Sequence, residues 1–163
     1  MIRRVNETMF AVVRSSRVIA VAALLALVVI TAAAAEPAQQ LSVEDLKARA
    51  TSASVGDRPH LCVQIAERQL DATDKLYASA DVDKAQSTLA DVVTYSEQAR
   101  DYAIQSHKYQ KQTEIAVRTM ARKLADIRHA VAHNDQQPIQ EAIGRLQRVR
   151  DDLLASMFHK GRK

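Results

Sequence analysis

The feature that most constrains this chain is an apolar repeat that runs from Val82 to Val131 without a helix breaker. Its members alternate by three and four residues, which is the heptad pattern of helices that pack lengthwise. Neither Gly nor Pro occurs between Val82 and Gln137. We therefore predict a single long helix here, straight or kinked. The stripe consists of Val82, Ala85, Leu89, Val92, Ser96, Ala99, Ala103, Ser106, Gln110, Thr113, Val117, Met120, Leu124, Ile127 and Val131.

Helix signals also precede this stripe. Residues 42–53 begin with a Ser that can cap a helix and with acids that suit a first turn, although few large apolar side chains follow. Residues 51–56 have the composition of a loop. Asp57 and Pro59 mark the next start, because Asp caps helices and Pro is tolerated in the first turn. Asp81 is the following candidate cap.

The pattern as a whole predicts an all-α fold. Only three Gly, three Pro and 4% aromatic residues argue against a β-sandwich or barrel. A break at residues 134–138 precedes a last helix, which gives two antiparallel helical hairpins over about 58–106 and 112–158. They either share the long middle helix, which the missing breaker favours, or fold back as a four-helix bundle, which Ile115 favours because it lies off the stripe. A faint repeat at an offset of fifty residues also suggests two hairpins.

The first 35 residues have the pattern of a targeting segment. Arginines precede an apolar run from Val18 to Ala35, and the run ends in small residues before Glu36. A basic start, an apolar centre and a small-residue exit predict a cleaved secretory signal, starting at Met1 or Met9. Eighteen residues are near the lower limit for spanning a bilayer, so an uncleaved N-terminal anchor is the alternative. We expect an exported protein, periplasmic or secreted.

The expected divisions of the chain follow from these boundaries. They are a signal peptide at 1–35, a short tail with a marginal helix and a loop at 36–57, the helical hairpin domain at 58–158 and a basic tail at 159–163.

Charge is distributed unevenly between the two halves. Residues 36–105 hold seven basic and twelve acidic side chains, whereas residues 106–163 hold twelve basic and six acidic ones. Beyond the leader the net charge is only +1, so the chain lacks the basic excess that nucleic-acid binding usually needs. A dipolar rod of this kind can self-associate or contact anionic envelope surfaces. Within the basic half, Lys111, Arg118 and Arg122 are candidate partner-binding residues.

Three tyrosines recur at intervals of seven beside the polar middle of the stripe. Tyr95, Tyr102 and Tyr109 would lie on one side of a continuous helix. One interpretation is that their rings pack against a neighbouring helix at the edge of the core. The other is an exposed aromatic stripe for a protein partner, because Tyr is enriched among interface anchors.

Residues with metal-binding or redox chemistry are few. His129 and His133 are four apart on the expected helix, with Asp126 one turn earlier, which makes the three weak metal candidates. The default interpretation of these three residues is a solvated polar face. Cys62 lies on an apolar stripe, where a buried inert thiol is the default and an intermolecular disulfide the alternative. Met120 fits a core position better than a haem-ligand position.

No catalytic, phosphate-binding, di-iron or c-type haem motif occurs in the sequence. We therefore expect no enzyme activity, no cofactor and no small-molecule substrate, but rather an exported helical interaction or scaffold protein with a protein partner. The alternatives are a metal- or haem-binding helical bundle and a basic module that contacts anionic envelope surfaces.

Residues 66–98 resemble one hairpin of the tetratricopeptide type. Leu76 and Tyr77, the turn at residues 80–85, and then Leu89 and Val92 follow that family's spacing, whereas Gln69 and Thr73 replace its large aromatic and small residues. The resemblance implies a helical hairpin and protein binding. Taken whole, the chain resembles small exported helical proteins of bacteria.

Overall fold

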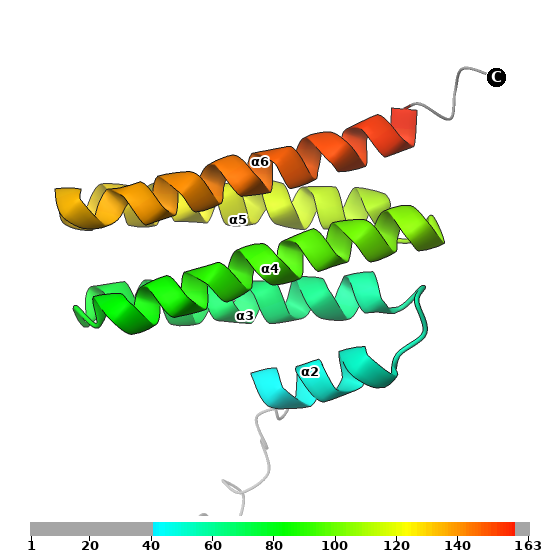
Figure 1. Cartoon of the computed structure of the whole chain (residues 1–163), viewed down its shortest axis with the longest axis horizontal. Coiled ribbons are helices and arrows are strands. Elements are labelled where there is room, and N and C mark those ends of the chain that lie inside the picture. Colours follow the sequence, from blue (N-terminus) through cyan, green and yellow to red (C-terminus); the bar gives the residue numbers. More distant parts are fainter. Residues whose placement is uncertain (1–40, 159–163) are drawn as a thin grey trace, which may run out of the picture. The chain divides into compact units, whose positions relative to one another are not determined.

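The structure, a computed structural model, describes residues 41–158, and all regular elements in that range are helical (Figure 1). The expected all-α class is confirmed. The predicted signal peptide and the basic tail at 159–163 lie outside the described residues. In chain order the elements are α2 (Val43–Ser52), α3 (Arg58–Ala78), α4 (Val82–Ser106), α5 (Gln110–Ala130), the 3-10 turn η2 (His133–Asp135) and α6 (Gln136–Phe158).

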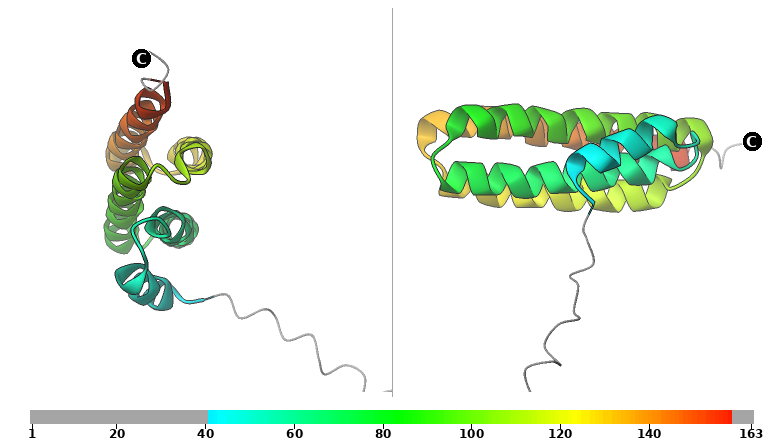
Figure 2. Two further views of the ribbon diagram at one scale, coloured as in Figure 1. Left: turned by 90° about the vertical axis from the view of Figure 1, so that its right-hand side faces the viewer. Right: turned by 90° about the horizontal axis from the view of Figure 1, so that it is seen from below.

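The helices form two antiparallel hairpins stacked side by side. α3 pairs with α4 and α5 pairs with α6, and the hairpins meet chiefly through α4 against α6. Seen along the helices, α2, α4 and α6 form one layer and α3 and α5 the other (Figure 2). The hairpins span residues 58–106 and 110–158, close to the limits predicted from the sequence.

The prediction of a continuous helix from Val82 to Val131 is wrong, because the chain reverses between α4 and α5. His107 (φ 57°) and Tyr109 (φ 60°) both adopt the left-handed conformation, which ends one helix and redirects the chain before the next. The Ser106 hydroxyl accepts a hydrogen bond from the Lys108 amide at 3.3 Å. The break was missed because the left-handed positions are occupied by His and Tyr and not by Gly.

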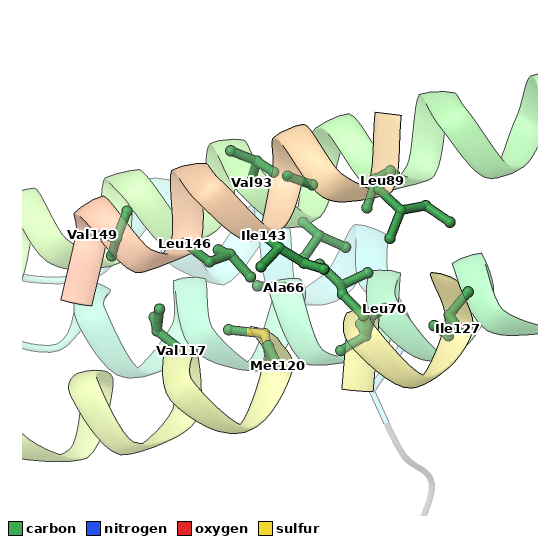
Figure 3. Close-up of a cluster of buried hydrophobic side chains, with 14 of the residues drawn as sticks. Ala66, Leu70, Leu89, Val93, Val117, Met120, Ile127, Ile143, Leu146 and Val149 are labelled. Carbon is green, nitrogen blue, oxygen red and sulfur yellow. The ribbon is translucent and has the colours of Figure 1, made fainter. Parts of the chain in front are cut away.

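The apolar stripe still marks the buried side of each separate helix. From Ala85 to Ala103 on α4, and from Thr113 to Ile127 on α5, its members are buried. Most of them join residues of α3 and α6 in the main core (Figure 3), whereas Ala99 belongs to a small second cluster with Cys62 and Val63. Leu124, Leu146 and Leu153 are fully buried in the main core.

Helices α2, α3 and α4 begin where the sequence predicts, but only one of the three predicted capping side chains caps its helix. Ser42 forms a capping box with Asp45, its hydroxyl accepting from the Asp45 amide at 3.0 Å. The Asp57 and Asp81 side chains make other contacts instead of capping their helices. Asp57 accepts from the Ser54 hydroxyl at 2.7 Å, and Asp81 pairs with Lys84 at 2.6 Å.

The second reversal begins earlier than the sequence indicated. α5 ends at Ala130, η2 covers His133–Asp135, and α6 starts at Gln136. Pro138 therefore lies in the first turn of α6 and not in the break, at a position where a missing N–H costs nothing.

The two oppositely charged halves of the chain lie against each other. In three of the four ion pairs between the hairpins, a base of the second hairpin meets an acid of the first. The pairs are Lys123–Asp71 at 2.7 Å, Lys123–Asp74 at 3.6 Å, Arg145–Glu97 at 2.8 Å and Asp152–Arg100 at 2.9 Å. Part of the charge asymmetry is therefore satisfied within one molecule. Among the described helices, none has the length and apolarity to cross a membrane.

Candidate functional site

A groove of about 430 Å³ runs between α5 and α6. It lies on the side of this hairpin that faces away from α3 and α4, because Lys123 and Arg145, which reach those helices, project from other sides of α5 and α6. Apolar side chains form its floor and long polar ones its rim. The floor consists of Val117, Ala121, Ala125, Ile143 and Leu146, and the rim of Arg118, Arg122, Gln147 and Arg150.

The floor combines core residues with small ones. Val117 and Leu146 are fully buried and belong to the common core, where they project into the space between α5 and α6 (Figure 3). Ala121 and Ala125 are one turn apart on α5 and only partly buried. Because both are alanines, an approaching side chain or helix can come close to the α5 backbone.

The rim is positively charged. Glu114, only 7% exposed, accepts a hydrogen bond from Arg150 Nε at 2.9 Å across the hairpin, and Arg118 Nε lies 3.8 Å from the same carboxylate. Arg122 has no ion pair within residues 41–158. Arg150 and Arg118 therefore share one carboxylate and Arg122 has none within the described residues, which leaves an excess of two positive charges beside the apolar floor.

The groove lies at one end of the helical stack. α5 and α6 are the last described helices, and the views in Figure 2 show none beyond them, whereas α2 covers the opposite end by packing on α3. Apolar side chains are also exposed close by in sequence: Ile115, three residues before Arg118, is 41% exposed, and Phe158 at the end of α6 is 74% exposed. Ile115, which lies off the apolar stripe, is thus exposed on α5, and the chain folds back after α4 as the alternative that it favoured predicts.

The candidate tyrosines contact neighbouring helices. Tyr95 and Tyr102 border the small core cluster around Cys62, and Lys47 and Arg58 lie over their rings at 5.5 and 5.2 Å. Tyr109 lies in the reversal, where its 39% exposed ring stacks on His60 at 5.9 Å. The three rings thus do not share one helix face. Tyr95 and Tyr102 pack against neighbouring helices at the edge of the core, which was the first of the two interpretations.

The three candidate metal-binding residues, Asp126, His129 and His133, do not lie together on one face of a single helix. α5 ends at Ala130, so His129 lies in its last turn and His133 in η2, which removes the predicted one-turn spacing. Both line an open polar hollow with Arg128 and Glu141. Asp126 is exposed and is not among the residues around that hollow. In residues 41–158, no group of three His, Cys, Asp or Glu side chains is arranged to hold a metal ion.

Cys62 is buried between α3 and α4, with 1% of its surface exposed. Burial raises the pKa of its thiol to about 11, against a smaller opposing effect of Arg58. A small hollow beneath α2 is lined by Cys62, Lys47 and Arg58 among others. Arg58 is already engaged there, donating to the Ala53 and Thr51 carbonyl oxygens, so these contacts hold the α2–α3 loop in place.

Fold and groove together define the chain as an all-α protein of two stacked hairpins with an open, arginine-rimmed groove at one end. No protein-family model, curated protein or solved structure matches it.

Sequence reasoning found part of this groove. Arg118 and Arg122 were candidates from the charge cluster, whereas the structure leaves Lys111 exposed in the first turn of α5, outside the groove lining. Arg150, Ala121 and Ala125 were missed. A usable signal was present in α5, where two alanines four apart lie beside two arginines four apart.

Proposed function

We propose that this chain is an exported, non-enzymatic interaction module that binds a segment of a partner protein in the α5–α6 groove. The observation that carries the proposal is the combination of an apolar floor and a basic rim at the uncovered end of the stack. A central apolar region with a polar rim is the usual anatomy of a protein-binding surface.

The packing between the two hairpins supports a helix-lined binding surface. The α3–α4 hairpin packs against α5 and α6 through an apolar face flanked by ion pairs. The α5–α6 groove likewise combines an apolar surface with charged residues at its edge, on the opposite side of the α5–α6 hairpin. A partner segment that binds there would bury surface that the described residues leave exposed.

Export and the absence of catalysis rest on the sequence. The leader pattern at residues 1–35 supports an envelope or extracellular location, and the lack of any catalytic motif supports a binding role. The partner would then be another envelope or secreted protein.

The rim arginines also favour a second candidate, contact with an anionic envelope polymer or lipid surface. Such a surface would engage the guanidinium groups but would leave the floor of Val117, Ala121 and Ile143 unfilled. The recessed apolar floor therefore favours a peptide segment over a flat anionic surface.

Site-specific photocrosslinking in the native host tests the proposal. A benzoylphenylalanine at Gln147, on the rim, is expected to capture a defined envelope protein, and the same group at Ser87, exposed on α4, serves as the matched control. Adding Ala121→Glu should abolish the Gln147 adduct, because a carboxylate then occupies the floor. Identical adducts from Gln147 and Ser87, or an adduct indifferent to Ala121→Glu, would refute the groove as the binding site.

A further inference from the structure

We infer that the occupant of the α5–α6 groove is an amphipathic helix of a partner protein that carries carboxylates on both sides of its apolar stripe. The inference rests on the proposed function and specifies the chemistry of the partner. It follows from the shape of the floor, the charge of the rim and the way in which this chain packs its own hairpins.

The shape of the groove suits a helix. From Val117 to Ala125 its α5 wall comprises nine residues, a length of about 12 Å for eight steps of about 1.5 Å, which corresponds to about two turns of a bound helix. Ala121 and Ala125 permit close approach to α5, while Ile143 supplies apolar contact from α6. An amphipathic helix laid in an apolar groove is a recurring mode of peptide recognition.

The charge of the groove selects acidic side chains. None of its lining residues is acidic, and Glu114 beside it is already bound by Arg150. Arg118 and Arg122 are one helical turn apart, so carboxylates at positions i and i+4 of a bound helix can meet both. Arg150 stands on the α6 side and bonds to Glu114 through Nε, so its terminal nitrogens can meet a further carboxylate across the apolar stripe. Arginine binds a carboxylate through two parallel N–H donors, so these contacts require the carboxylate to lie in a defined orientation.

The interface between the hairpins supplies an internal precedent. There, Lys123 meets Asp71 and Asp74, and Arg145 meets Glu97, so basic groups of the second hairpin pair with acids of the first beside an apolar seam. Arg100 with Asp152 is the one pair of opposite polarity between the hairpins. At the free end the chain again presents basic groups beside apolar ones, which favours a complementary helix that presents acids.

A second copy of this chain fits the groove less well. The acidic end of the stack is covered by α2, whose exposed side chains are small or polar, with Ala48 the one exposed apolar residue of that helix. Leu46, its buried apolar residue, already packs within its own molecule. Helix α2 would thus bring carboxylates to the groove but no exposed large apolar side chain of its own, and Val55, 38% exposed in the loop after α2, is a single small contact.

Synthetic peptides and the chain from Glu36 to Lys163, which contains all the described helices, test the inference. The probe is a fluorescent helical peptide of about fourteen residues with a Leu and Ala stripe flanked by Glu at i and i+4 spacing, and its control has Lys in place of each Glu. Fluorescence anisotropy should show the Glu peptide binding at least about tenfold more tightly, a difference that shrinks with added salt. Equal affinities would overturn the inference.

Charge reversal distinguishes groove binding from general attraction. The variant Arg118→Glu with Arg122→Glu should reject the Glu peptide and accept the Lys peptide, whereas reversal of Arg148, exposed on α6 outside the groove lining, should leave the preference unchanged. Gain of Lys-peptide binding also shows that the double variant is folded. An unchanged preference would refute the assigned arginines.

Two further experiments test for other occupants of the groove. Phosphatidylglycerol vesicles that bind as tightly as the Glu peptide and compete with it would point to an anionic lipid surface, and a concentration-dependent dimer abolished by Ala121→Glu would point to a second copy. Either result overturns the inference. A photocrosslinked partner whose attached segment lacks acids would refute only the partner chemistry, whereas absence of any groove-dependent adduct would refute the proposed function.

Discussion

Arg150 on α6 bonds to the buried carboxylate of Glu114 on α5, with Nε and Oε1 2.9 Å apart. Glu114 is one of four buried polar or charged residues in the described chain and the one charged residue among them. The contact joins the two walls of the groove near its rim. It therefore both stabilises the second hairpin and fixes the position of one rim guanidinium.

Removing the arginine should cost more stability than neutralising the acid. Arg150→Met leaves the Glu114 carboxylate buried with only Arg118, 3.8 Å away, as a cationic neighbour, and we expect a loss of about 1–3 kcal/mol. Glu114→Gln keeps an acceptor oxygen, and the partly exposed Arg150 can regain water, so the loss should be smaller. Urea unfolding followed by helical circular dichroism ranks the two variants. A larger loss for Glu114→Gln would contradict the view that the buried carboxylate is the partner that depends more on the contact.

A charge in the core should unfold the second hairpin. Leu124 is fully buried and Ile127 nearly so, and Leu124→Asp or Ile127→Asp would place an unpaired carboxylate among apolar side chains. Such a change costs several kcal/mol, comparable with the total stability of a small domain. His129→Ala, on the exposed side of the same helix, is the control and should unfold at the parent temperature. An unchanged melting temperature for Leu124→Asp would mean that the core is wrongly assigned.

The helical limits were predictable because their signals are local. The three-and-four spacing identified buried residues such as Leu89 on α4 and Leu124 on α5, and Ser42 with Asp45 marked the start of α2. Burial of one helix side depends only on which residues share that side. The stripe remained informative even though its two parts belong to separate antiparallel helices.

The reversal and the groove were less predictable for physical reasons. At the reversal, His107 and Tyr109 adopt a left-handed conformation that their side chains disfavour, so their residue types gave no signal for it. The groove combines α5 with α6, and it is open because no described helix covers that end. Arg118 was found from local charge, but the joint role of Arg150 and Ala121 depends on residues about thirty positions apart.

Glycine at a left-handed position should stabilise the chain. His107 is exposed and has φ 57°, where a Cβ atom is unfavourable, so His107→Gly should add about 0.5–1 kcal/mol despite the greater freedom of Gly in the unfolded chain. Ala90→Gly, at an exposed position inside α4, is the matched control and should lose about 1 kcal/mol. Thermal unfolding measures both. Equal destabilisation by the two changes would contradict a left-handed residue at position 107.

Export predicts a defined mature N-terminus. Intact-mass analysis of protein from the native host should show a chain that starts at Glu36, because the small residues at 33 and 35 fit the pattern of a signal-peptide cleavage site. Replacing Ala35 with Phe should block processing, whereas Ala38→Phe, beyond the site, should not. A full-length, membrane-embedded natural chain would instead support the N-terminal anchor.

The Cys62 thiol should be slow to react and should make stability depend on alkaline pH. Its pKa is raised by burial from 9.0 to about 11, so below pH 9 the thiol is protonated in both states and contributes no pH dependence. Between pH 9 and 11 the unfolded chain loses the proton first, which favours unfolding, and the contribution of the thiol to stability falls as pH rises.

Two measurements check this. Iodoacetamide at pH 8 should modify Cys62 far more slowly in the folded protein than in urea, because the thiol is both buried and protonated. From pH 9 to 11, the parent should lose stability more steeply than Cys62→Ala, by on the order of 2 kcal/mol at most, since the alanine variant shares every other titrating group. Parallel pH curves for the two proteins, or equal labelling rates with and without urea, would mean that the thiol is open to solvent.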